Sequence, residues 1–252
     1  MNRLAKQVIY SLFFLVVIAI IIGIFYFIFS RNKPTCFDRI QNQGELGVDC
    51  GSVCGNNCLP TEFKPVQVSD VWIIGVDSNH ISILAKIENP NQNVAAKNFN
   101  YEFSVKDENG QVKNTILGSD FIFAGEIKYI LKANISAKFS LSDYGELTIR
   151  NPKWVSGQDF LKPQLNIQNT DVSISDSKIK LTGIVVNSDN LKISSIKIIS
   201  IFYTNNSFRP LGASETEISN LTPGSSNPFV IYHPIITSAD LSRTKTFAFG
   251  FW

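Results

Sequence analysis

The strongest pattern in the sequence is an apolar run near its start. Residues 8–29 contain no charged side chain, and a helix needs about 20 apolar residues to cross a hydrocarbon core roughly 30 Å thick. A single helix satisfies its own backbone hydrogen bonds in lipid, which an irregular segment does not do. The pattern therefore predicts a single-pass transmembrane helix over 8–29, with residues 1–7 as a short cytoplasmic tail.

A cleaved signal peptide is the alternative interpretation of the same run. The apolar core of a signal peptide spans about 7–15 residues and ends at a small-x-small cleavage site. This run is longer, and Phe25 to Ser30 offers no such site. We therefore predict that the helix stays on the protein as an anchor.

A second pattern, short alternating strands, begins at residue 66. Clear examples are Ile81–Ile87 and Phe99–Val105, and turn signals follow them at Asn89–Asn93 and Asp107–Gly110. Helical periodicity is absent after residue 30. Short strands at this spacing are typical of an antiparallel β-sandwich.

The strand pattern then repeats. Lys180–Asn187 matches the strand that ends at Asn89, and the two asparagines are 98 positions apart, the length of one sandwich domain. The predicted fold is all-β, with two tandem antiparallel immunoglobulin-like β-sandwiches at 66–151 and 163–252. We expect the second to fold alone. Its strand Ile196–Tyr203 should turn either Ile201 or Phe202 inward, and alternation does not decide which.

The second half also resembles a known family of modules. The resemblance lies in three segments and the two residues that follow them: Leu181–Asn187, Ile198–Tyr203, Ile218–Gly224, Pro228 and Phe229. They are similar to FxLYD modules and to the related type 2 late-embryogenesis-abundant sandwich. The resemblance implies non-catalytic accessory or interaction units.

Between helix and strands, residues 34–59 form a separate Cys-rich module. All four cysteines of the chain lie here: Cys36, Cys50, Cys54 and Cys58. Clustered cysteines in even number favour two disulfides, which persist in oxidising compartments, and three pairings are possible. Zinc sites prefer C-x2-C pairs, which this spacing lacks, and the spacing matches no common iron–sulfur pattern.

The cysteines also orient the helix. Positive residues flank both of its ends, so the positive-inside rule leans only slightly toward an inside N-terminus. Because disulfides form outside the cytoplasm, the bulk of the chain is predicted to lie outside, on a cell-membrane anchor.

The Cys-rich module resembles short modules of bacterial secreted and surface proteins with the pattern C-x-D-G-I-Q-N-x-x-E-x-G-x-D-C-G-G-x-C. Arg39 stands at the first Gly of that pattern, and Ser52 at the second Gly of the pair. Four side chains of the module offer oxygen atoms of the kind that Ca²⁺ prefers, although not at EF-hand spacing. These candidate calcium ligands are Asp38, Asn42, Glu45 and Asp49. Solvated or turn-capping carboxylates are the alternative, and no other cofactor is expected.

Composition and motifs reduce the number of function classes that fit the chain. A formal net charge of +2 without a run of like charges indicates no nucleic-acid partner. No common catalytic motif occurs, and His80 and His233 are far apart and expected at the surface, so no enzyme is predicted. The sequence favours a membrane-anchored scaffold that displays its sandwiches to an extracytoplasmic protein. The alternative is a structural envelope component that self-assembles, or joins a secretion or pilus apparatus, through sheet edges.

Overall fold

The computed structural model describes residues 3–29, 35–205 and 207–252. Residues 1, 2 and 34, which belong to the predicted tail and Cys-rich module, lie outside this set, as do the flanking charges Arg31 and Lys33. The chain divides into two compact units, Met1–Cys58 and Leu59–Trp252. Each unit is described by itself.

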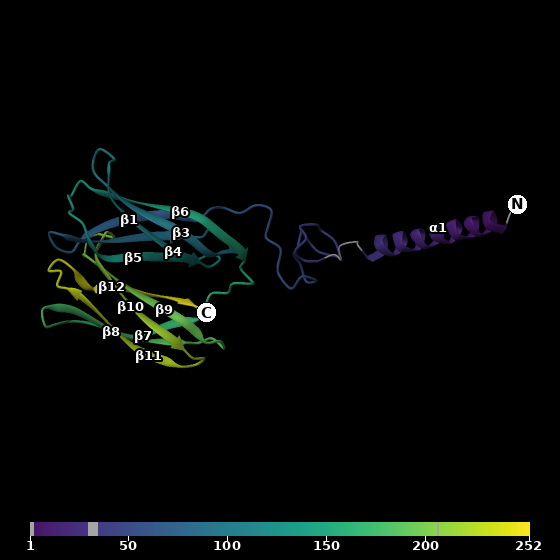
Figure 1. Cartoon of the computed structure of the whole chain (residues 1–252). Helices are drawn as coiled ribbons and strands as arrows, with labels where there is room; N and C mark the ends of the chain where they lie inside the picture. Colours follow the sequence, from purple (N-terminus) through teal and green to yellow (C-terminus); the bar gives the residue numbers. More distant parts are fainter. Residues whose placement is uncertain (1–2, 30–34, 206) are drawn as a thin grey trace. The chain divides into compact units, whose positions relative to one another are not determined.

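The first unit begins with helix α1, Arg3–Phe29 (Figure 1). Its stretch Lys6–Tyr26, 21 residues long, is apolar enough to cross a membrane, and none of it is buried against protein. The predicted helix is thus confirmed as an element. A signal sequence near the N-terminus would pass the same test of length and composition.

The second unit is built of antiparallel strands. Six of the described strands form the first sandwich: β1 Gln67–Gly75, β2 His80–Glu88, β3 Val94–Lys106, β4 Val112–Ile122, β5 Ile127–Ser136 and β6 Tyr144–Ser156. Six more form the second: β7 Leu165–Ser175, β8 Lys178–Asn187, β9 Ile193–Tyr203, β10 Pro210–Leu221, β11 Ser226–Pro234 and β12 Asp240–Phe251.

The two sandwiches have the same topology. In the first, the sheet β1-β2-β5 faces the sheet β4-β3-β6; in the second, β7-β8-β11 faces β10-β9-β12. Adding six to each strand number of the first sandwich gives the second. Crossing from one sheet to the other after the second strand is a Greek-key feature of immunoglobulin-like folds. Figure 1 shows the blue-to-teal strands stacked on the green-to-yellow ones. The predicted fold class is confirmed.

Each sandwich has its own apolar core. In the first, β2 and β3 turn alternate side chains inward, among them Ile83, Ile87, Phe99 and Phe103, all fully buried. In the second, the core includes Leu181 on β8 and Ile198 on β9. Period-2 alternation, read in the sequence, is what places these residues on one face.

A third apolar cluster, which was not among the predictions, joins the two sandwiches. We call it the junction cluster; it consists of Ile74, Leu84 and Leu131 from the first sandwich and Ile199, Ile201, Tyr203, Ala213 and Phe249 from the second. Sheets β1-β2-β5 and β10-β9-β12 are therefore inner layers of a four-layered stack. Their central strands bury both faces.

The junction cluster answers the question left open for β9. Ile201 belongs to the junction cluster, whereas Phe202 lies on the opposite face of the strand, its ring 5.0 Å from that of His233 on β11. Both are fully buried. The expectation that only one of them points inward is wrong, because apolar layers cover the strand from both sides.

The connection between the sandwiches is shorter than the predicted ranges, 66–151 and 163–252, imply. Strand β6 continues through Asn151 and Pro152 to Ser156, with a register shift opposite Asn98 and a φ of 52° at Asn151. Asparagine tolerates this left-handed conformation, and proline is accepted at bulges and edge strands, where its missing N–H is not needed. Pro152 therefore marks a β-bulge rather than a linker.

Candidate functional site

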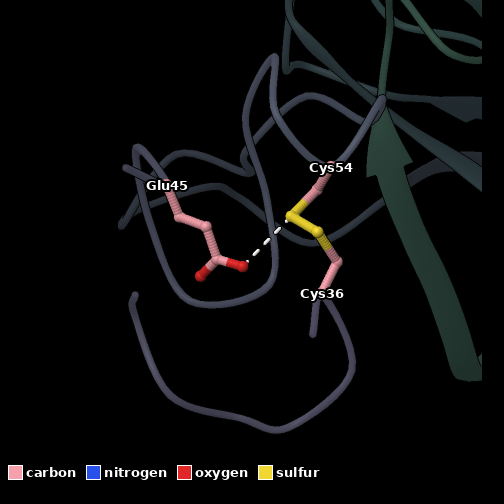
Figure 2. Close-up of side chains that lie close together, drawn as sticks. All are labelled: Cys36, Glu45 and Cys54. Atoms are coloured by element: carbon pink, nitrogen blue, oxygen red, sulfur yellow. Dashed lines mark hydrogen bonds between the residues drawn. A yellow bond between two sulfur atoms is a disulfide. The ribbon is translucent and has the colours of Figure 1, made fainter. Parts of the chain in front are cut away.

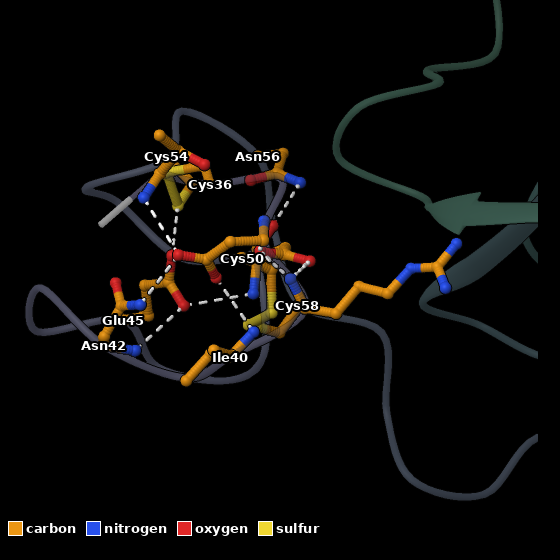
Figure 3. Close-up of a disulfide and its surroundings, with 12 residues drawn as sticks. Cys36, Ile40, Asn42, Glu45, Cys50, Cys54, Asn56 and Cys58 are labelled. Atoms are coloured by element: carbon orange, nitrogen blue, oxygen red, sulfur yellow. Dashed lines mark hydrogen bonds between the residues drawn. A yellow bond between two sulfur atoms is a disulfide. The ribbon is translucent and has the colours of Figure 1, made fainter. Parts of the chain in front are cut away.

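The Cys-rich module is closed by two disulfides, Cys36–Cys54 and Cys50–Cys58 (Figure 3). The predicted disulfides are confirmed, and the structure selects one of the three pairings. The bonds interlock, since Cys50 lies within the first loop and Cys54 within the second. Short cross-linked loops restrict the unfolded chain, which is how a segment without a core of its own stays folded.

Glu45 is the central polar residue of the module. Only 6% of it is exposed. Its Oε2 accepts hydrogen bonds from the backbone N–H groups of Asn42 and Asp49, at 3.3 and 3.1 Å. Its Oε1 lies 3.1 Å from Cys54 Sγ (Figure 2). A disulfide sulfur carries no proton, so this last contact is not a hydrogen bond while the disulfide is intact.

Asp38 and Asp49 fold the start of the module onto its end. Asp49 Oδ1 accepts the backbone N–H groups of Asp38 and Arg39, and Asp38 accepts those of Thr35 and Ile40. A side-chain hydrogen bond from Asn42 and the backbone N–H of Thr35 lower the pKa of Asp38 from its ordinary value. Charge-assisted bonds of this kind favour the ionised carboxylate.

The structure thus brings the four predicted calcium ligands together, but the carboxylate oxygens among them already accept hydrogen bonds from the backbone. Each of the three carboxylates accepts hydrogen bonds from backbone amides, which matches the turn-capping alternative. Asn42 Oδ1 is buried with no hydrogen-bond partner among the described residues. Calcium binding stays a prediction.

Cys36, Glu45 and Cys54 also converge closely enough to suggest a metal site (Figure 2). A soft metal ion is bound by thiolates. Both sulfurs here are bonded to each other, so they offer no thiolate in this state. The cluster is a structural core of the module.

Two equivalent asparagines hold the loops of the sandwiches. Asn89 Nδ2 donates to the carbonyls of Val94 and Phe123, and Asn187 Nδ2 donates to those of Leu191, Leu221 and Thr222. Both asparagines are fully buried. The 98-residue repeat in the sequence passes through these two residues, so the matching asparagines mark the same loop-closing position.

His233 is the clearest error of the sequence analysis. It is 8% exposed rather than at the surface, and it packs against Phe202. Its Nδ1 lies 2.6 Å from the carbonyl oxygen of Pro234. Burial lowers its pKa from the ordinary value, against the opposing effect of this hydrogen bond. The alternation of Phe229, Ile231 and His233 on β11 was the available signal. His80, by contrast, is partly exposed at the start of β2, beside Asp77.

Buried charges in the first sandwich were also missed. The side chain of Lys128 on β5 is 3% exposed; its Nζ lies 2.5 Å from Asp120 Oδ1 and 3.4 Å from the ring centre of Phe121. Desolvation lowers the pKa of Lys128, opposed by the nearby carboxylate. Buried Glu126 pairs with Lys162 in the segment that connects the sandwiches. Pairing is what makes such burial tolerable, and sequence patterns do not reveal partners of this kind.

Comparisons with known proteins add little. No protein-family model matches the chain, and no curated protein matches it. Among solved structures, red sea bream transglutaminase is matched at 8% identity and a TM-score of 0.23, over 76% of this chain and 32% of that one. The chain thus spans about a third of that protein's length, and a likeness this distant carries no functional argument.

Proposed function

We propose that the chain is a membrane-anchored interaction protein that presents its two joined sandwiches outside the cytoplasm. The observation that carries this proposal is helix α1, whose apolar stretch of 21 residues has no protein to cover it. Leaving so many apolar side chains in water is costly, at roughly 25 cal/mol per Å² of apolar surface. A bilayer is the natural solvent for them.

The Cys-rich module supports the outside location. Its two disulfides follow the helix within a few residues, and they need an oxidising compartment to persist. A non-catalytic role agrees with the resemblance to FxLYD-type interaction modules. The sandwiches then act as a rigid display platform, because the junction cluster prevents them from swinging on a flexible linker.

Fractionation and protease protection test this proposal. We expect the intact chain in the membrane pellet after carbonate extraction, with its original N-terminus on Edman sequencing. In cells whose plasma membrane is exposed, added protease should digest residues 59–252. A mature N-terminus between Ser30 and Cys36 would refute the anchor, and protection of the sandwiches would refute the orientation.

A self-assembling envelope component is the second candidate, favoured by strand β4. Among the described strands it pairs only with β3, and it leaves Val112 and Leu117 56% and 70% exposed. An open edge with apolar side chains is a template for strand pairing. Sedimentation of the detergent-solubilised chain distinguishes the two candidates: a monomer at micromolar concentration supports the display platform, and a concentration-dependent polymer supports assembly.

A further inference from the structure

A groove of about 660 Å³ opens beside the junction cluster. One wall comes from the first sandwich, with Trp72 on β1, Lys86 on β2 and Tyr129 on β5. The other comes from the second, with Tyr203 on β9, Arg209 before β10 and Lys245 on β12. We call it the basic groove. Neither sandwich alone forms it.

Its charge is unbalanced. Lys86, Arg209, Arg243 and Lys245 line it, against the single carboxylate of Asp70. None of these four cations forms an ion pair within the described part of the chain, whereas lysines elsewhere in the sandwiches and in their connection do, at positions 106, 113, 128, 162 and 197. Unpaired positive charge in a hollow concentrates its field on whatever enters.

The aromatic side chains are fixed in place. Tyr203 belongs to the junction cluster, and Trp72 and Tyr129 pack against it. The Tyr129 ring lies 4.7 Å from that of Phe247, and burial raises the pKa of Tyr203 to about 12, so its hydroxyl stays neutral. Rigid aromatic surfaces bind with little loss of conformational entropy.

Thr244, Arg243 and Phe208 are further parts of the groove's lining. Thr244 also lines the groove, and its hydroxyl oxygen is buried with no hydrogen-bond partner among the described residues. Arg243 donates to the backbone carbonyls of Thr204 and Asn205, which holds the loop before β10 at the rim. Phe208, 81% exposed in that loop, lies under the Arg243 guanidinium at 5.4 Å.

From this chemistry we propose that the basic groove binds an acidic peptide segment of a partner protein, with glutamate or aspartate side chains beside an aromatic residue. Arginine, tryptophan and tyrosine are the residues that dominate protein-interface energies, and all three line the groove. Carboxylates would pair with Arg209 and Lys245, and the aromatic residue would pack on Trp72 and Tyr129. A volume of this size suits a segment of a few residues.

A smaller cavity across the same junction offers a contrast. It measures about 370 Å³, and Lys128 and Lys197 in its lining are paired with Asp120 and Glu215. With Lys97 and Glu217 also in the lining, three cations face two carboxylates, so its charge is more nearly balanced than that of the basic groove. The basic groove is therefore the cavity whose lining has the larger excess of unpaired positive charge.

The test uses the full chain in nanodiscs and a fluorescein-labelled peptide, Glu-Tyr-Glu-Glu-Tyr-Glu, followed by anisotropy. We expect saturable binding that weakens as salt is raised. Arg209→Glu with Lys245→Glu should weaken it by about tenfold or more, as loss of charged hot spots does. The matched control is Lys178→Glu with Lys192→Glu, which changes the net charge equally at exposed positions outside the groove; it should leave affinity within about twofold.

Several outcomes would overturn the proposal. These are an absence of saturable binding below 1 mM, an equal loss in both double variants, or equal binding of a Lys-Tyr peptide. A Glu-Ala peptide that binds as well as the Glu-Tyr peptide would refute the role of the aromatic walls. Binding of an oligogalacturonate, lost in the groove variant while no peptide binds, would assign the groove to a saccharide instead. The inference rests on the proposed display function, but membrane location and topology are measured separately, so failure of one leaves the other standing.

Discussion

Asn89 and Asn187 show how single residues define this fold. Each lies at the end of the second strand of its sandwich, and each donates from its amide group to a carbonyl where the fourth strand ends, that of Phe123 or Leu221. In both cases the side-chain oxygen accepts a backbone N–H two residues on. One side chain thereby satisfies several buried backbone groups, which apolar residues do not do.

Replacing either asparagine by alanine should therefore be costly. Asn187→Ala would remove the side-chain donor from the carbonyls of Leu191 and Leu221, and from that of Thr222, which keeps its hydrogen bonds from Ser225. An unsatisfied buried group costs about 1–3 kcal/mol. We expect a lower midpoint of urea unfolding. Asn166→Ala, which removes only an exposed hydrogen bond to Ser188, is the control and should stay within about 0.5 kcal/mol of the wild type. Equal midpoints for the two variants would contradict this role for the buried amide.

Arg39 carries backbone strain that a glycine at its position would avoid. It stands where the resembling pattern has glycine, and its φ is 61°, a left-handed conformation. Arg39→Gly should stabilise the module by about 1 kcal/mol, since the backbone bonds to Asp49 remain while the Cβ penalty disappears. A dithiothreitol titration of the full chain, followed by free-thiol labelling, measures this as resistance to reduction.

Gly44 provides the opposite test in the same module. Its φ is 82°, and a Cβ there would meet no atom within 4 Å, so Gly44→Ala adds conformational strain without a clash. We expect easier reduction for this variant. If both variants shift the titration in the same direction, backbone strain does not control the module's stability.

His233 should make the second sandwich sensitive to mild acid. Its pKa is lowered in the folded state by burial, so the unfolded chain binds more protons between that value and about 6.5. Stability is therefore highest above the unfolded pKa and falls as pH decreases, by up to about 1.4 kcal/mol per unit. Unfolding midpoints measured between pH 7.5 and 5 should show this slope. His233→Gln should flatten it; equal slopes for His233→Gln and the wild type would contradict the assignment.

At the scale of elements, glycine–aromatic pairs stabilise the outer sheets. Tyr101 on β3 lies opposite Gly118 on β4, and Phe229 on β11 lies opposite Gly183 on β8. A Cβ at Gly118 would come within 2.3 Å of the Tyr101 ring. The ring covers the strand where the glycine has no side chain, as edge glycines are rescued in designed sheets.

This packing predicts a contrast between two glycines. Gly118→Ala should destabilise the first sandwich by about 1–3 kcal/mol, because the Tyr101 ring has to move from a buried site. Gly75→Ala is the control, since its Cβ would meet only Phe139, at 3.8 Å. Thermal unfolding of both variants, followed by near-UV circular dichroism, checks the difference. A tolerated Gly118→Ala would mean that the ring moves freely.

The elements differ in how well the sequence predicted them. Strands with one clean apolar face, such as Phe99–Val105, were recognised from alternation. The first sandwich was predicted to end at residue 151, whereas here a bulge accommodates Asn151 and Pro152 and β6 continues to Ser156. The cysteines were predicted as disulfides from their clustering and even number. The acidic residues around them were candidates for calcium binding or for turn capping, because sequence alone does not show which carboxylates accept backbone amides.

At the scale of the whole molecule, the junction cluster changes the meaning of the repeat. A 98-residue period predicts two similar sandwiches, and it does not reveal that they share a core. The information was in strand Ile196–Tyr203, where both alternating faces are apolar. A strand of that kind is typical of an inner layer with a cover on each side, and the cover on one side is the neighbouring sandwich.

The two sandwiches should consequently unfold as one. Leu84, fully buried, belongs to the first sandwich but lies in the junction cluster, whereas its neighbour Ile83 faces the core of its own sandwich. Leu84→Ala should cost about 2–5 kcal/mol, as a large-to-small change in a packed core does. In calorimetry we expect a single transition that moves as a whole in both Leu84→Ala and Ile83→Ala. Two transitions, of which Ile83→Ala shifts only one, would mean that the sandwiches are independent.

The isolated fragment 163–252 completes this test. As a domain of ordinary size it was expected to fold alone, but removal of the first sandwich uncovers Ile199, Ile201 and Phe249, which are buried in the whole chain. A contiguous apolar patch of this kind on a monomer drives association. We therefore expect the fragment to be less stable than the full chain and to self-associate on sedimentation.

Ile201→Ser in the fragment should reduce that association, because it makes the uncovered face more polar. The same change in the full chain should instead lower the stability, because there it buries a hydroxyl group in the apolar junction cluster without a hydrogen-bond partner. Opposite consequences of one substitution would identify the junction as a genuine shared core; a monomeric, stable wild-type fragment would show that the second sandwich needs no partner.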